Sequence, residues 1–184
     1  MSNQYGGPAR TAELTGYTLP TGAGTGITGG TGTLYYTSVV QVGALIYTDI
    51  FIDLTGLNSG GTAADIIGKD GTANSHLGQI TNAINGSIVA GFMQCLETPA
   101  GGEPNIDLYS ATESTGTEDA AITGLAETAL LESSGDWVAT GALTVQGLTA
   151  VPADGKYLYL VAGDATSATY TAGKFLIRLI GVPV

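Results

Sequence analysis

Positive charge is scarce in this chain, and its scarcity excludes several functions. The 184 residues include 5 lysine and arginine residues against 16 aspartate and glutamate residues, so the formal net charge is -11. Proteins bind nucleic-acid backbones through arrays of lysine and arginine that displace counterions. The basic residues here form no cluster along the sequence. We therefore expect no binding to DNA or RNA and no attachment to an anionic membrane.

Cysteine and histidine are equally rare, with Cys95 and His76 the single examples. One cysteine excludes an internal disulfide, and its apolar neighbours predict a buried thiol. One imidazole and one thiolate cannot form a closed zinc site within the chain. His76 follows Asn74 and Ser75, which predicts an exposed loop, and no Gly-x-Ser-x-Gly motif presents a serine. We expect no catalytic residues, no metal, no cofactor and no enzymatic activity.

Long apolar runs are also missing. No segment approaches the roughly 18 apolar residues that cross a membrane, and the first residues lack the basic and apolar regions of a secretory signal. Charged residues make up 11% of the chain, against roughly 25% in a typical soluble domain. Two interpretations stay open: part of the surface is buried against other chains, or it consists of threonine, serine, glycine and asparagine.

Glycine and threonine dominate the N-terminal part of the chain. We predict an extended arm over residues 1–33 and a domain over residues 34–184. Spaced apolar residues suggest that the arm docks, on its own domain or on a neighbouring subunit, and the candidate subunit contacts are Tyr5, Leu14, Tyr17 and Leu19. Residues 24–29 match G-x-G-x-x-G, but that motif binds a dinucleotide only between a strand and a helix. We therefore interpret them as part of the arm.

Alternation of apolar and polar residues predicts strands through most of the domain. The clearest are residues 33–42, 44–54, 106–110, 156–161 and 174–182. Turn residues separate them, which favours an all-β fold with an antiparallel β-sandwich. Asn85-Gly86 predicts a hairpin turn. After the predicted helix, strand structure is expected to resume over residues 137–146.

One helix is predicted over residues 116–133. Thr115 and Glu118 have the spacing of a capping box, and apolar residues follow at helical intervals. A short strand over residues 127–132 is the alternative. Asp49 and Asp53 would lie about 13 Å apart on one strand face, too far apart for a glycosidase pair. Calcium at the Asp-Gly turns stays an open alternative.

The two C-terminal strands are largely apolar on both faces. One face of each strand can fill the core of a sandwich, whereas the other needs a cover from the arm or from another subunit. We predict subunit contacts at Leu158, Leu160, Leu176 and Ile180.

Five segments carry a family resemblance: residues 43–54, 58–62, 65–68, 156–160 and 170–179. Their strand and turn patterns resemble small structural proteins of tailed bacteriophages, namely capsid decoration (cement) and head-fibre proteins. The resemblance implies a jelly-roll-like sandwich that forms a homotrimer and binds the major capsid protein. It also implies a place in the virion, on the outer capsid surface, after synthesis in the host cytoplasm. The family offers no catalytic residues to carry over.

The sequence thus favours a structural virion protein that stabilises a phage head by bridging capsid subunits. The alternative is a tail or head-fibre component that binds host-surface glycans. For that alternative, Trp137 and the tyrosines are the candidate sugar-binding side chains, because aromatic rings are common at such sites.

Overall fold

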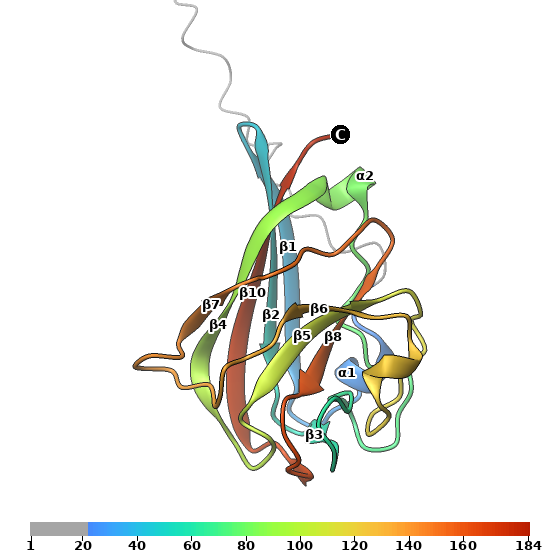
Figure 1. Cartoon of the computed structure of the whole chain (residues 1–184), viewed down its shortest axis with the longest axis vertical. Helices are drawn as coiled ribbons and strands as arrows, with labels where there is room; N and C mark the ends of the chain where they lie inside the picture. The colour runs from blue at the N-terminus through green and yellow to red at the C-terminus, as the bar shows by residue number, and fades with distance from the viewer. Residues whose placement is uncertain (1–21) are drawn as a thin grey trace, which may run out of the picture.

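The computed structural model describes residues 22–184, which fold mainly into antiparallel β-structure (Figure 1). The arm residues Tyr5, Leu14, Tyr17 and Leu19 lie outside the described residues. The strands, in chain order, are β1 (Leu34–Val42), β2 (Leu45–Asp53), β3 (Asn58–Ser59), β4 (Ser87–Ala100), β5 (Ile106–Ala111), β6 (Thr128–Leu131), β7 (Val145–Gly147), β8 (Tyr157–Ala162), β9 (Ala168–Thr169) and β10 (Ala172–Val182). The helices are α1 (Thr25–Thr28), α2 (Asn82–Asn85) and the 3-10 helix η2 (Ile122–Gly124).

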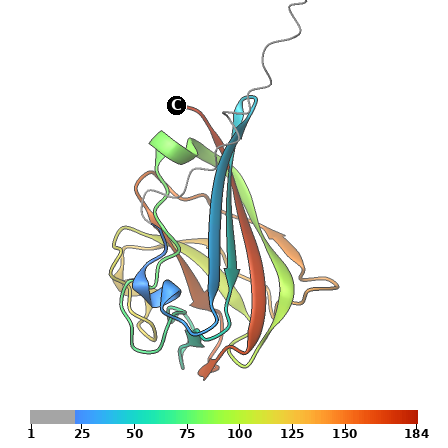
Figure 2. The same ribbon diagram turned by 180° about the vertical axis from the view of Figure 1, so that it is seen from behind.

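The larger sheet has five strands in the order β1-β2-β10-β4-β7. The hairpin of β1 and β2 is regular from the Leu34–Asp53 pair to the Val42–Leu45 pair. The C-terminal strand β10 lies between β2 and β4, and bulges interrupt only its pairing with β4. Figure 2 shows β1, β2, β10 and β4 side by side on the near side of the molecule.

The smaller sheet has three strands in the order β6-β5-β8 and lies in front of the larger one in Figure 1. A two-stranded ribbon of β3 and β9 is separate. The expected all-β antiparallel fold is confirmed, whereas the jelly-roll connectivity implied by the resemblance is not confirmed by these strand orders.

The main hydrophobic core lies between the two sheets. The larger sheet contributes Ile50 of β2 and Ile177 of β10, and the smaller sheet contributes Leu108 of β5 and Leu158 of β8, all fully buried. Trp137 closes one side of this core, where its ring meets Phe175 edge-on with 5.5 Å between centroids. Its indole N–H donates to the Ile106 carbonyl over 2.7 Å, so the polar atom of this buried ring is satisfied.

A second, smaller core lies on the other face of the smaller sheet. Tyr159 and Val161 of β8 pack there against Ile66 and Ile122, from segments that connect the strands. The segment around residues 65–78 also bonds to the backbone of β8, for example through the Ile67 N–H and the Leu160 carbonyl over 2.9 Å. The chain itself therefore covers the second apolar face of β8.

The predicted helix over residues 116–133 is wrong. The segment forms only η2 and then β6, so the alternative of a strand near residues 127–132 is confirmed. Asp119 and Ala126 adopt positive φ angles of 62° and 46°, which a right-handed helix does not contain. Glu118 does not cap a helix, because its carboxylate accepts the N–H of Gly71 over 2.8 Å. Ile122 is buried in the second core instead of lining a helix face.

Two further sequence predictions need correction. Asn85-Gly86 is not a hairpin turn, because Asn85 ends α2 and Gly86 leads directly into β4. The buried Asn85 side chain holds that junction by donating to the Thr48 hydroxyl over 2.9 Å. The strand expected after Trp137 is reduced to β7, and the tryptophan itself lies in a connecting segment.

Residues 22–33 are not an extended arm. They contain α1, and Ile27 of α1 is fully buried in the main core. Gly24 and Gly26 allow this segment to approach residues 74–76 closely: the Gly24 N–H donates to the His76 carbonyl over 2.9 Å. A Cβ on Gly24 would lie 1.8 Å from the Asn74 carbonyl oxygen, so the glycines of the G-x-G-x-x-G match serve packing.

We expect Gly24→Ala to lower the free energy of unfolding by about 1–3 kcal/mol, the usual cost of overpacking. Gly22→Ala is the matched control, because a Cβ there would meet nothing within 4 Å. Urea denaturation of both variants measures the difference. Equal stabilities would contradict the placement of residues 22–33 in the domain.

Candidate functional site

The face of the larger sheet that points away from the core is the strongest candidate site, and we call it the outer face. Strand register and alternation define its residues. They are Leu34, Tyr36, Ser38, Val40 and Val42 of β1, Leu45, Tyr47, Asp49, Phe51 and Asp53 of β2, Lys174, Leu176, Arg178, Ile180 and Val182 of β10, Phe92 and Gln94 of β4, and Val145 of β7.

Large apolar side chains of the outer face are exposed at both margins of the sheet. On β1, Tyr36 is 63% exposed and Val42 is 60% exposed, while Val145 on β7 is 50% exposed. Between them, Leu176 and Ile180 of β10 are half-buried by their neighbours. Contiguous apolar surface on a folded protein is typical of interaction sites, so the outer face has the composition of a contact surface.

An ion pair lies at the centre of the outer face. The Arg178 guanidinium donates from Nε and Nη2 to the two carboxylate oxygens of Asp49, with 2.6 Å for each bond. The same guanidinium lies 5.6 Å from the Tyr47 ring centroid and 6.0 Å from that of Phe92, within range of cation–π attraction. The hydrogen bonds to Asp49 raise the pKa of Arg178, which keeps it charged.

A second charged group lies four residues before Arg178 on β10. The Lys174 ammonium contacts Glu97 of β4 and lies 3.5 Å from an Asp53 carboxylate oxygen on β2. Burial acts to raise the pKa of Asp53, but hydrogen bonds from Thr55 and the charge of Lys174 lower it overall. The carboxylates and cations of the outer face therefore largely neutralise one another, in a chain that is strongly acidic overall.

The outer face also has a depression beside its central ion pair. Its volume is about 320 Å³. The lining residues are Val40, Val42, Tyr47, Asp49 and Arg178. Apolar walls around a partly exposed guanidinium suit a protruding apolar side chain with a polar tip, because both parts of such a side chain would find a partner.

The four predicted contacts from the C-terminal strands divide between two environments. Leu176 and Ile180 lie on the outer face, where their role as contacts stays a prediction. Leu158 and Leu160 are fully buried in the main core, so the prediction that they contact another subunit is wrong. The reason is that β8 has its own cover on each face, from the larger sheet and from the second core.

Sequence reasoning missed the contribution of β1. Leu34, Tyr36 and Val42 are exposed on the outer face. The sequence did contain a signal for this face. Residues 34–42 carry no charge, and apolar side chains occur at both odd and even positions, so they lie on both faces of the strand. In a half-buried strand the solvent face is normally polar, so an uncharged strand of this kind indicates a face that meets another surface.

The single histidine and the single cysteine both lie in the interior. His76 is 6% exposed, so the prediction of an exposed loop is wrong. Its ring lies edge-on to Tyr157 at 4.9 Å between centroids, and burial lowers its pKa. Cys95 is buried as predicted, and burial raises the pKa of its thiol to about 11.

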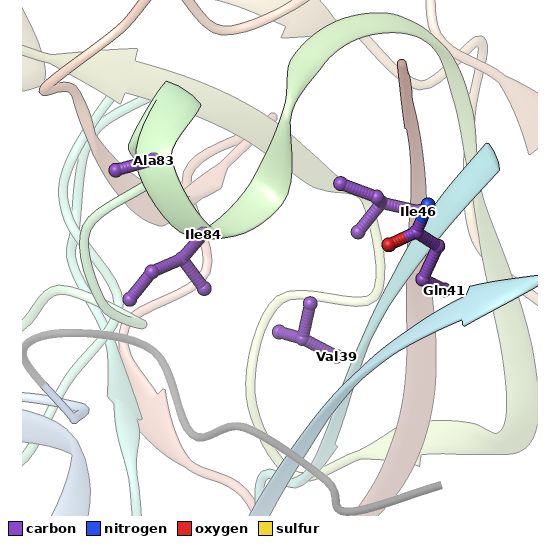
Figure 3. A pocket seen from close by; sticks show the side chains of 5 residues that line it. All are labelled: Val39, Gln41, Ile46, Ala83 and Ile84. Carbon is purple, nitrogen blue, oxygen red and sulfur yellow. The ribbon is translucent and has the colours of Figure 1, made fainter. Parts of the chain in front are cut away.

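A cavity of about 300 Å³ opens at the end of the sandwich near α2 (Figure 3). It lies between the inner side of the β1–β2 hairpin and α2, and its lining residues are Val39, Gln41, Ile46, Ala83 and Ile84. Its lining thus combines four aliphatic side chains with one amide.

The described part of the chain carries neither a metal-binding cluster nor a helix that could cross a membrane. Among residues 22–184, no group of three or more His, Cys, Asp or Glu side chains is placed to hold a metal ion. Within the same range, no helix has the length and apolar character that crossing a membrane requires. Comparisons with protein-family models, with curated proteins and with solved structures found no match to this chain.

We expect the Arg178–Asp49 pair to show a coupling energy of about 1 kcal/mol in a double-mutant cycle, because it is bidentate but partly exposed. The cycle uses Arg178→Met and Asp49→Asn, with urea unfolding as the measurement. The coupling should fall in 1 M salt. A control cycle of Arg178→Met with Asp164→Asn, an exposed loop residue, should show none. Equal coupling energies in the two cycles would contradict a specific interaction between Arg178 and Asp49.

Asp107 of β5 gives the fold a pH dependence. Burial raises its pKa from 3.8 to about 6, although the Ser133 N–H that bonds its carboxylate acts in the opposite direction. Between these two values only the folded state holds the proton, so this group makes stability fall as pH rises through the window.

Asp107→Asn removes that titration while its amide oxygen can still accept the Ser133 N–H. We therefore expect the variant to gain stability relative to the unsubstituted protein on going from pH 4 to pH 7. Urea unfolding at the two pH values measures the change. A stability difference that is the same at both pH values would show that Asp107 does not titrate in this range.

Proposed function

We propose that this chain is a structural virion protein that binds the outer surface of a bacteriophage head and stabilises it by bridging capsid subunits. The observation that carries the proposal is the outer face, an apolar surface whose charges are paired with one another. The phage assignment comes from the resemblance of the strand and turn segments to decoration and head-fibre proteins.

The physical properties of the outer face suit binding to a protein surface. Apolar side chains at both margins lose water on contact, which favours association by roughly 25 cal/mol for each Å² buried. The Arg178–Asp49 pair is already formed, so docking leaves no charge without a partner. A guanidinium between aromatic rings is a common component of the energetically dominant part of an interface.

Bridging gives attachment its strength. A copy that contacts two capsid subunits, or an oligomer that contacts several, converts later contacts into intramolecular ones at a high effective concentration. Each contact then needs only modest affinity. The acidic remainder of the surface would face solvent, where charge keeps the particle soluble.

The glycan-binding alternative is weakened because its main candidate side chain, Trp137, is not accessible to a sugar. Trp137 is fully buried against Phe175, so it presents no ring to a sugar. Exposed aromatic surface is found instead at Tyr36 on the outer face, which the proposal assigns to protein contact.

We expect Leu176→Ser and Ile180→Ser each to weaken binding to phage heads at least tenfold, because they remove apolar area from the centre of the outer face. The heads are purified from the phage that encodes this chain, after deletion of its gene, and binding is measured by co-sedimentation. Val151→Ser is the control, because Val151 is 39% exposed and lies outside the outer face.

A second measurement addresses stabilisation. Heads that have bound the unsubstituted protein should withstand a higher temperature before releasing DNA, and the two outer-face variants should not provide this protection. Absence of binding by the unsubstituted protein, or equal binding by all variants, would overturn the proposal.

A further inference from the structure

Among the strands of residues 22–184, β1 is an edge strand with one side that no described strand pairs with. Its nine residues pair with β2 along their whole length, and no strand within residues 22–184 pairs with its other side. A free edge presents a row of backbone N–H and C=O groups that can pair with another strand. β1 is therefore a template for a further strand.

The other sheet margins are short or covered. β7, at the opposite margin of the larger sheet, has three residues. In the smaller sheet, the free side of β8 is bonded by the chain itself, with the Leu77 N–H donating to the Leu158 carbonyl over 2.7 Å. The free side of β6 receives the Thr149 N–H at the Leu130 carbonyl over 2.8 Å. β1 is the exception to this pattern.

The sequence of β1 also lacks the features that normally prevent edge pairing. Proteins protect exposed edges with lysine, proline, inward charges or β-bulges. Residues 34–42 read LYYTSVVQV, with no charged residue and no proline, and their pairing with β2 has no register shift. A long, uncharged edge without a bulge favours pairing.

We propose that β1 pairs antiparallel with β1 of a second copy of this chain, across a two-fold axis that passes beside Ser38. The two five-stranded sheets then form one continuous sheet with a continuous outer face. Closed two-fold pairs are the commonest symmetric assemblies. A strand without charge can pair with itself, because no like charges are brought together.

The register about Ser38 is self-complementary. It places Leu34 opposite Val42 of the second copy and Tyr36 opposite Val40, all on the outer face. Directly opposed apolar and aromatic side chains each stabilise a strand pair by roughly 0.2–1 kcal/mol. A shift by one residue would place inner-face and outer-face side chains opposite each other, so the centred register is favoured.

This inference does not rest on the phage-head proposal, and it differs from the homotrimer that the resemblance implies. A dimer that does not bind phage heads would support the strand pairing and overturn the proposed function. A monomer or trimer that binds heads would do the reverse.

The first test is the mass of the full-length chain in solution by light scattering. We expect a species of twice the 18.4-kDa chain mass. Ser38→Lys should weaken dimerisation at least tenfold, because two like charges would face each other at the axis. Val145→Lys, on the same face at the opposite margin, should leave dimerisation unchanged. A monomer or a trimer at micromolar concentrations overturns the proposal.

The second test fixes the register. Under oxidising conditions Ser38→Cys should form a covalent dimer, because the two Cβ atoms would lie about 4.5–5.5 Å apart. Val40→Cys should not, because its two copies would be offset by about 13 Å along the strands. The native Cys95 is buried and does not compete. A dimer that cross-links at position 40 and not at position 38 overturns the proposed pairing.

Discussion

Strand β10 holds the larger sheet together, because it pairs with β2 on one side and with β4 on the other. Its inner side chains, Phe175, Ile177 and Leu179, are fully buried in the core between the sheets. Its outer side chains include the guanidinium at the centre of the outer face. Without β10 the β1–β2 hairpin would have no partner, so the core, the outer face and the free edge of β1 all depend on this one strand.

The same sequence pattern has two different outcomes in β8 and β10. Both strands are largely apolar on both faces. In β8, the second face is covered by connecting segments that carry Ile66 and Ile122. In β10, Leu176 and Ile180 stay half-exposed on the outer face. The cover of β8 comes from residues far away in sequence, and no local pattern identifies it. Only the structure separates a core strand from a contact strand here.

Local patterns nevertheless predicted much of the fold. Alternation placed β1, β2, β5, β8 and β10 close to their observed bounds, because a half-buried strand needs one apolar face. The prediction of a helix over residues 116–133 was wrong. Ile122 fits the helical spacing of apolar residues, but its burial comes from tertiary contacts in the second core. The prediction that His76 is exposed was wrong because its burial depends on Tyr157 of β8, which lies 81 positions further along the chain. Such contacts are invisible to local spacing.

The position of β10 in the sheet has a consequence for the synthesis of the protein. β10 follows every other strand of residues 22–184, yet it lies between two of them. While the ribosome makes residues 34–171, the apolar edges of β2 and β4 have no central partner. Unpaired edges in a nascent chain are prone to aggregate, and non-local strand pairing is slow. The unpaired edges of β2 and β4 therefore persist in the nascent chain until β10 has been made.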